Sequence, residues 1–302
     1  MGLYGKLWKD AGRIKMGIKV DIKRKLGEFS LDIHFQTESK RIGILGASGC
    51  GKSMTLKSIA GIETPDFGMI QIDDKVLFDS ANKVDLKPQK RNVGYLFQNY
   101  ALFPTMTVAK NIAAGLKGSK EEKQKKVQEM IEKFELNTKQ RINKMSKGML
   151  SMVTIIVALA SKADFTFLDE PVAGLDVVMR EYFYHKLMEE YTETGRTFVI
   201  STHIIEEAAD LMEEVIMIKD GSLLLKENTQ DLLERSYHVS GLAEVVDQAA
   251  EGYEKHHEEK MGRSKSVTIL LKEGQELPKD YDVTIQPISL EKLFVSLCGL
   301  DD

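Results

Sequence analysis

The sequence predicts an α/β fold with a parallel sheet at its core, on two observations. An apolar segment, residues 41–45, is followed by a glycine-rich stretch and then by residues 54–60, whose apolar side chains have helical spacing. A second apolar segment, residues 165–168, ends in two carboxylates, Asp169 and Glu170. Parallel strands covered on both faces are apolar throughout, and ligands bind beyond their carboxyl ends. We therefore expect both segments to be buried strands with functional residues just after them.

The glycine-rich stretch after the first strand fits the phosphate-loop pattern GxxxxGK[ST]. Glycines let the backbone N–H groups point at phosphate oxygens, and the following helix adds the positive end of its dipole. Lys52 would reach the β- and γ-phosphates, and the Ser53 hydroxyl would hold Mg²⁺. A chance match in a turn is the alternative, and the flanking strand and helix argue against it. We predict nucleoside triphosphate binding by Gly46, Ser48, Gly49, Cys50, Gly51, Lys52 and Ser53.

Further motifs follow the loop in a fixed order. They are Gln98 in YLFQN, residues 145–149 (MSKGM), residues 165–170 (FTFLDE), residues 173–176 (AGLD) and residues 201–203 (STH). The series resembles the ATP-binding cassette (ABC) transporter family from about residue 20 to residue 226. The resemblance implies a P-loop NTPase fold with a RecA-like core and a helical subdomain, together with ATP and Mg²⁺ as ligands.

The resemblance also implies the roles of single residues. Glu170 corresponds to the general base or water-positioning group, and His203 to the residue that contacts the γ-phosphate and steadies that glutamate. Gln98 corresponds to the residue that senses Mg²⁺ and the attacking water, while Asp169 joins Ser53 in holding the metal. A lone glutamine or histidine is more often a surface or satisfied polar residue. Their position within the series favours the functional interpretation.

The signature motif departs from the usual LSGGQ, because Lys147 replaces a glycine. Ser146 and Gly148 remain, and Ser146 is also a good N-cap for an apolar helix over residues 149–160. In the ABC family the signature and Asp176 of one protomer face the phosphate loop of another. One copy of each motif therefore implies a homodimer, or a heterodimer with a related ATPase, closed by ATP.

The chain divides into a leader over residues 1–17, a nucleotide-binding domain over residues 18–235 and a small α+β domain over residues 236–302. A helical subdomain is expected at about residues 98–160. Strand and helix composition in the last domain predicts strands at residues 237–239, 267–270 and 283–285, and helices at residues 242–251 and 289–297, the second capped by Ser289.

Composition limits the partners. The net charge of −4 gives no reason to expect nucleic acid. Two cysteines, one of them in the phosphate loop, indicate a reducing cytosol without a disulfide framework. No run of eighteen apolar residues is present. We expect a cytoplasmic protein, peripheral on the inner face of the cell membrane, whose permease subunits are separate chains.

The finer resemblance is divided. Residues of about 20–136 resemble molybdate-type importer ATPases, and residues of about 145–302 resemble ATPases of ABC-2-type exporters. The larger matched span favours export. The alternatives are a molybdate-type anion importer, and a soluble or impaired ATP-binding module without transport.

The residue that stacks on the nucleotide base is not obvious. Members of the ABC family usually place an aromatic residue ahead of the first core strand. Here Leu26 lies near that position and Phe29 lies slightly later. Phe29 is more simply interpreted as a core strand residue.

Overall fold

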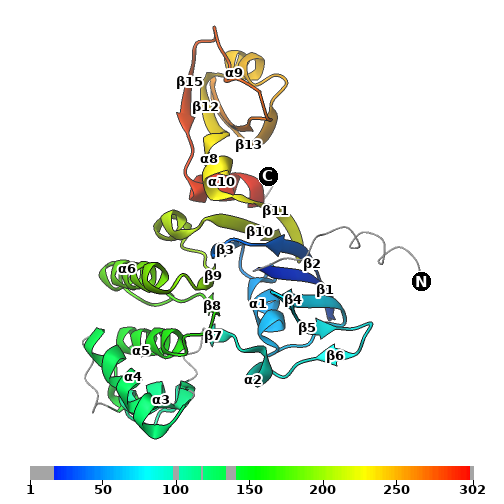
Figure 1. The fold of residues 1–302 in the computed structure, drawn as a ribbon. Coiled ribbons are helices and arrows are strands. Elements are labelled where there is room, and N and C mark those ends of the chain that lie inside the picture. Colours follow the sequence, from blue (N-terminus) through cyan, green and yellow to red (C-terminus); the bar gives the residue numbers. More distant parts are fainter. Residues whose placement is uncertain (1–16, 98–101, 117, 134–140, 300–302) are drawn as a thin grey trace.

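A computed structural model describes residues 17–97, 102–116, 118–133 and 141–299. Within these ranges an eleven-stranded sheet has the order β6-β5-β4-β1-β2-β11-β10-β3-β9-β8-β7 (Figure 1). Its strands are β1 Ile18–Leu26, β2 Phe29–Thr37, β3 Arg41–Leu45, β4 Phe67–Ile72, β5 Lys75–Asp79, β6 Val84–Asp85, β7 Gly94–Leu96, β8 Phe165–Asp169, β9 Thr197–Ser201, β10 Glu214–Lys219 and β11 Ser222–Asn228.

The predicted parallel core is confirmed. Strands β10, β3, β9, β8 and β7 pair in parallel, and every residue of β8 and β9 is buried. The chain returns between these strands through helices, as parallel pairing requires. The helices of this part are α1 Lys52–Ala60, α2 Pro88–Arg91, α6 Val177–Thr194, α7 Ile205–Ala208 and α8 Thr229–Glu234, with a 3₁₀ turn at Ala209–Leu211.

The other end of the sheet is antiparallel, which the sequence argument did not predict. Strand β1 pairs antiparallel with both β2 and β4, and β5 and β6 continue the same arm. Alternate residues of β2, such as Leu31, Ile33 and Phe35, are buried under α1 and its neighbours. This alternation is typical of an antiparallel sheet with one covered face.

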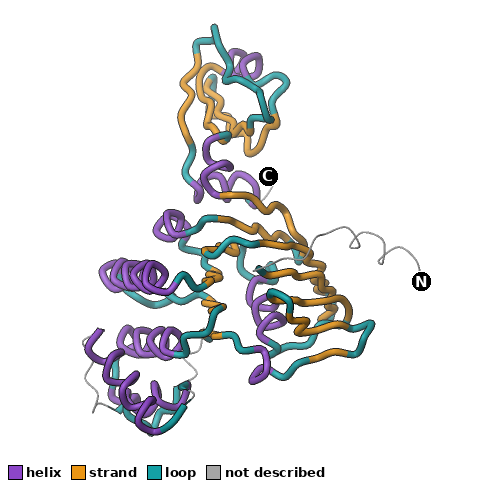
Figure 2. The backbone as a smooth tube through the Cα atoms, viewed as in Figure 1, coloured by secondary structure: helices purple, strands orange, loops and turns teal. Residues whose placement is uncertain are grey.

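Helices α3 Val108–Gly115, α4 Lys120–Lys133 and α5 Lys147–Ala160 form a separate group, with a 3₁₀ turn at Ile142–Lys144 just before α5. Figure 2 shows them gathered at one end of the molecule, away from the antiparallel arm. The Ser146 hydroxyl accepts a hydrogen bond from the Met149 N–H at 3.3 Å, so the predicted N-cap of α5 is confirmed.

The last part of the chain forms a four-stranded sheet of order β13-β14-β12-β15. Its strands are β12 Ser236–Leu242, β13 Glu254–Met261, β14 Ser264–Leu270 and β15 Val283–Pro287, and its helices are α9 Ala243–Ala249 and α10 Leu290–Cys298. The Lys292 N–H donates to Ser289 Oγ at 3.4 Å, which confirms that cap. Strand β13 was not predicted. The domain boundary at residue 235 stays a prediction.

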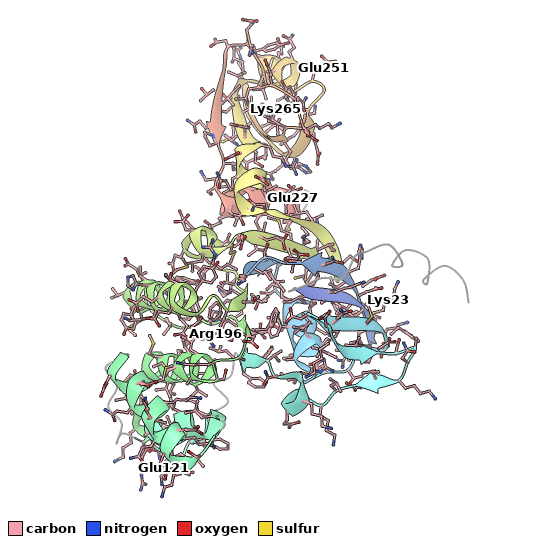
Figure 3. The ribbon with its side chains drawn as sticks, in the orientation of Figure 1. Lys23, Glu121, Arg196, Glu227, Glu251 and Lys265 are labelled. Atoms are coloured by element: carbon pink, nitrogen blue, oxygen red, sulfur yellow. The ribbon has the colours of Figure 1, made fainter. Side chains whose placement is uncertain are left out.

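Two ion pairs join elements that are separate in the sequence, and Figure 3 labels one residue of each, Arg196 and Glu227. Arg196, directly before β9, pairs with Glu190 of α6, and both side chains are buried. The Arg235 guanidinium binds Glu227 through two bonds of 3.2 and 2.5 Å and donates to the Leu271 carbonyl at 3.3 Å. Because Glu227 lies in β11 and Leu271 follows β14, Arg235 ties the large sheet to the small one.

Candidate functional site

The glycine-rich loop lies between β3 and α1, beyond the carboxyl end of a central parallel strand. Gly51, directly before α1, has a φ of 113°, and a Cβ there would lie 2.5 Å from Cδ1 of Leu31. A Cβ on Gly46 would lie 2.3 Å from Sγ of Cys50 and 2.6 Å from the carbonyl oxygen of Ile218. Only glycine fits this backbone at both positions.

Lys52 opens α1 and is only 7% exposed. Its ammonium group donates to the carbonyl oxygens of Gly46 at 2.6 Å and Ala47 at 3.1 Å. The positive charge is therefore held at the mouth of the loop. A phosphate there would replace neutral carbonyl acceptors with charged ones, which form stronger hydrogen bonds.

Asp169, at the end of β8, collects three hydroxyl donors although its side chain is buried. Its Oδ1 accepts from Ser53 at 2.8 Å and from Ser201 at 2.7 Å, and its Oδ2 accepts from Tyr95 at 2.9 Å. Burial and the neighbouring carboxylate of Asp169 raise the pKa of Tyr95, so this hydroxyl keeps its proton and donates. The predicted metal residues Ser53 and Asp169 are thus brought into direct contact.

Glu170 and His203 also meet. His203 Nδ1 lies 2.7 Å from Glu170 Oε2, and the His203 N–H donates to the same oxygen at 3.3 Å. The glutamate side chain is 10% exposed and the imidazole 58% exposed. Glu170 has a φ of 49°, and its N–H donates to the Ser201 carbonyl at 3.0 Å. The Glu170 carboxylate thus contacts a residue that follows β9, the strand beside its own.

A cavity of about 760 Å³ opens beside the loop, and we name it the phosphate-loop cavity. Its volume lies within the roughly 300–1,000 Å³ of small-molecule sites. Phe29 is one of its walls, and its ring lies 3.4 Å from where a Cβ on Gly51 would stand. The interpretation of Phe29 as solely a core strand residue is therefore incomplete. The full lining is Glu28, Phe29, Ser30, Ala47, Ser48, Gly49, Cys50, Ile218, Lys219, Asp220, Cys298 and Gly299.

Cys50 faces inward from the same loop. Burial raises the pKa of its thiol, and the charge of Lys52 only partly opposes this effect. At neutral pH the thiol is therefore uncharged and packs in the core cluster beside the loop.

Three predicted residues lie apart from this cluster. Ser146 caps α5, Gly148 lies in its first turn, and Asp176 caps α6 by accepting from the Met179 N–H at 2.9 Å. None of them lines the phosphate-loop cavity. Gln98, predicted as a catalytic and metal-contacting residue, lies outside the described residues.

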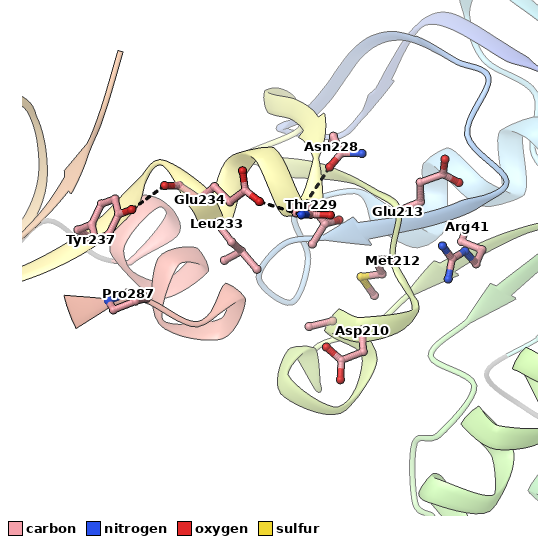
Figure 4. A pocket seen from close by; sticks show the side chains of 12 residues that line it. Arg41, Asp210, Met212, Glu213, Asn228, Thr229, Leu233, Glu234, Tyr237 and Pro287 are labelled. Carbon is pink, nitrogen blue, oxygen red and sulfur yellow. Dashed lines mark hydrogen bonds between the residues drawn. The ribbon is translucent and has the colours of Figure 1, made fainter. Parts of the chain in front are cut away.

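A second cavity of about 830 Å³ lies between the large sheet and the four-stranded sheet. Figure 4 shows Arg41 and Glu213 on one side of it and Tyr237 on the other, where the Tyr237 hydroxyl donates to the Glu234 carbonyl at 2.9 Å. This cavity contains none of the predicted site residues. The candidate site is therefore the phosphate-loop cavity, whose walls include Ser48, Gly49 and Cys50. The side chains that it does not include among its lining residues are Lys52, Ser53, Asp169, Glu170 and His203.

Among the residues that the structure describes, no group of three or more His, Cys, Asp or Glu side chains is arranged to hold a metal ion. The same residues contain no helix with the length and apolar character needed to span a bilayer.

Comparisons with known proteins bear on the family and the fold. The family model described as "ABC transporter" matches residues 27–173. The chain is 37% identical over 196 residues to an Fe(3+) ions import ATP-binding protein of Pectobacterium atrosepticum, covering 64% of this chain and 56% of that protein. It is 33% identical over 220 residues to a probable sulfate/thiosulfate import ATP-binding protein of Chlorella vulgaris, covering 70% of this chain and 91% of that protein. A spermidine/putrescine import ATP-binding protein of Acetivibrio thermocellus is 35% identical, and the match covers 68% of this chain and 58% of that protein. The chain thus spans little more than half of the first and third relatives.

Solved structures show the same fold. The dimeric post-hydrolysis structure of the ATP-binding cassette MJ0796, bound to ADP and Pi, has a TM-score of 0.61 at 27% identity, covering 70% of this chain and 98% of that one. The structure of cbiO1 from Clostridium perfringens has a TM-score of 0.61 at 25% identity, covering 72% and 90%.

The relatives bear on the direction of transport. All three are named as import proteins. The relatives therefore support the alternative of import better than the prediction of ABC-2-type export. The export prediction rested on motifs after residue 145 and on the C-terminal segment. Similarity over 64–70% of the chain carries more weight than those shorter motifs.

Proposed function

This chain belongs to the ABC transporter family of ATP-binding proteins, and from that premise we propose that it is the ATP-hydrolysing subunit of a membrane transporter. The observation that carries the proposal is the junction of three elements: the loop that ends in Lys52, the carboxylate of Asp169 and the Glu170–His203 pair. Ser201 links them, because it donates to Asp169 and accepts from the Glu170 N–H. The residues proposed for phosphate binding, metal binding and water activation thereby lie together at one edge of the sheet.

The residues around Asp169 fit Mg²⁺. The ion prefers oxygen ligands and few carboxylates, and the Ser53 and Asp169 oxygens already lie 2.8 Å apart. When bound, Mg²⁺ neutralises charge that develops on the phosphates during phosphoryl transfer. Tyr95 and Ser201 hold the Asp169 carboxylate in place for that role.

In the proposed reaction Lys52 exchanges its carbonyl acceptors for phosphate oxygens. Glu170 accepts a proton from the attacking water as general base, and His203 holds its carboxylate by the 2.7 Å contact. Ser146, Gly148 and Asp176 are assigned to the site of a second protomer, because in the ABC family these motifs face the phosphate loop of another protomer; here they lie at the starts of α5 and α6. We therefore propose that two protomers close over ATP.

An ATP-dependent dimer is the test. Glu170→Gln retains the side-chain shape but removes the base, so bound ATP persists, and light scattering should report a dimer with Mg-ATP and a monomer without it. Lys52→Ala is the matched control, which should stay monomeric because it lacks the phosphate ligand. A monomeric Glu170→Gln protein that has bound ATP would refute the dimer mechanism.

The membrane partner has a candidate surface. A groove of about 270 Å³ between α3 and α5 is lined by Tyr95, Phe97, Leu102 and Phe103, and Phe103 is exposed. Aromatic side chains around an apolar groove are typical of a protein contact. Tyr95 also binds Asp169, so a permease in this groove would touch a direct partner of the proposed metal ligand. With a permease docked in this groove, the protein would lie at the inner face of the membrane.

We propose import as the direction, in line with the names of the relatives. The test uses proteoliposomes that carry the copurified permease with this subunit outside, loaded in the lumen with molybdate, sulfate or spermidine. ATP added outside should release one of these solutes from the lumen if the system imports. ATP-driven accumulation of a solute in the lumen would instead establish export.

A further inference from the structure

Helix α10 is anchored in the core of the large sheet. Leu290 and Leu293 are buried in the same hydrophobic cluster as Ile205 and Ala208 of α7, against which α10 packs. Helix α7 begins two residues after His203. Figure 1 shows α10 at the base of the four-stranded sheet, next to the large one.

The same helix is bonded to the small sheet. The Ser296 hydroxyl lies 2.9 Å from the Thr268 hydroxyl of β14, and α10 also packs against β13. Helix α10 therefore has one set of contacts with the ATPase core and another with the C-terminal strands. A displacement of the helix would break contacts on both sides.

The carboxyl end of α10 reaches the phosphate loop. Cys298 and Gly299 line the phosphate-loop cavity together with Ser48, Gly49 and Phe29. These five residues come from three distant parts of the chain. The cavity is therefore closed on one side by a segment that neither the phosphate-loop motif nor the family model, which ends at residue 173, includes.

We propose that the carboxyl end of α10, at Cys298 and Gly299, is a wall of the nucleotide-binding site that contacts the base or ribose of the bound nucleotide. The inference rests on the proposed binding of ATP at the phosphate loop. The phosphates must lie on the loop N–H groups and Lys52, which leaves the uncharged part of the nucleotide to the remaining walls. These walls are the Phe29 ring, the 218–220 turn and the end of α10.

The chemistry of this wall suits an uncharged ligand group. Burial raises the pKa of Cys298 to about 11, although the charge of Lys219 opposes the shift. The thiol is therefore neutral at pH 7 and behaves as a small apolar group with a weak donor. Phe29 offers an aromatic face on which a base can stack.

The contact gives the C-terminal strands a physical connection to nucleotide binding. Nucleotide that touches Cys298 would stabilise α10 in its observed position. Through Ser296 and Thr268 the same position is favoured by β14, and through Leu293 by α7. Nucleotide binding at the carboxyl end of α10 is thus linked to the packing of the helix against β14 and α7, because both favour the same position of the helix.

Alkylation of the wild-type chain tests the contact. Cys298 should react with N-ethylmaleimide in the free protein, and ADP should slow its modification at least fivefold, measured on the Cys298 peptide by mass spectrometry. Binding of a fluorescent ADP is measured in parallel. If fluorescent ADP binds while the modification of Cys298 is unchanged or accelerated, the proposal is overturned. If fluorescent ADP does not bind at all, the proposed function falls as well.

Substitutions on α10 provide the second test. Cys298→Trp should raise the Kd for ADP at least tenfold because the indole fills the cavity. Val295→Trp is the matched control, since Val295 lies on the same helix, is 49% exposed and does not line the cavity. Equal affinity of the two tryptophan variants would contradict the proposal. Misfolding of Cys298→Trp, detected by circular dichroism, leaves the alkylation result as the deciding measurement.

Discussion

Replacing Tyr95 with phenylalanine should destabilise the protein at pH 8 and flatten its loss of stability above pH 10. The Tyr95 hydroxyl donates to the buried Asp169 carboxylate at 2.9 Å. Removing the donor leaves a buried charged oxygen with one partner fewer. A hydrogen bond to a charged group contributes about 1.5–3 kcal/mol to the free energy of unfolding, and we expect a loss of that size.

The pH dependence follows from the direction of the shift. Burial and Asp169 raise the pKa of Tyr95 in the folded protein above its ordinary value of about 10. This stabilisation is complete below pH 10 and is lost as the pH rises toward the folded pKa, because the unfolded state ionises first. One such group lowers the free energy of unfolding by about 1.4 kcal/mol per pH unit in that range.

Urea denaturation followed by circular dichroism at pH 8, 9, 10 and 11 measures both effects. The difference in the free energy of unfolding between the wild type and Tyr95→Phe should be constant from pH 8 to 9. It should shrink by about 1.4 kcal/mol by pH 11. Tyr184→Phe is the control, because burial also raises the pKa of Tyr184. In this variant the free energy of unfolding should fall less steeply above pH 10, while the hydrogen bonds to Asp169 remain. A Tyr95→Phe difference that is near zero at pH 8, or independent of pH, would refute the reasoning.

Two further substitutions test the loop and the C-terminal helix. Gly46→Ala should abolish binding of fluorescent ADP, because the new Cβ would meet Cys50 Sγ at 2.3 Å and the Ile218 carbonyl at 2.6 Å; normal affinity would show that the loop can relax. Leu293→Ala should lower the free energy of unfolding by about 2–5 kcal/mol, since the side chain is fully buried, whereas Val295→Ala should cost less than about 0.5 kcal/mol. Similar costs for both, measured by urea denaturation, would mean that α10 does not pack in the core.

Much of the site could be predicted because its signals are local. The loop, the acidic end of β8 and the caps of α5 and α10 each depend on a few consecutive residues. Ser53 and Asp169 were assigned to one metal site, and they lie in contact. These interactions follow from motif and strand order, because the loops that follow parallel strands lie at the carboxyl edge of the sheet.

The remaining features depend on distant contacts. The bond from Tyr95 to Asp169 spans 74 positions, and nothing in the sequence around Tyr95 indicates it. The Cys298 wall likewise depends on where α10 packs. Strand β13 escaped prediction because EKHHEEKM is charged and almost entirely exposed, so it lacks apolar alternation. Its place at the edge of the small sheet explains this composition, since charges protect an edge strand from pairing with other chains.

The rate of ATP hydrolysis as a function of protein concentration tests the central claim most directly. For the wild type with Mg²⁺ the rate should rise more steeply than linearly, because two protomers form each site, and Glu170→Gln should bind ATP but hydrolyse almost none. A rate strictly proportional to concentration, or a Glu170→Gln variant as active as the wild type, would contradict the proposed ATPase mechanism.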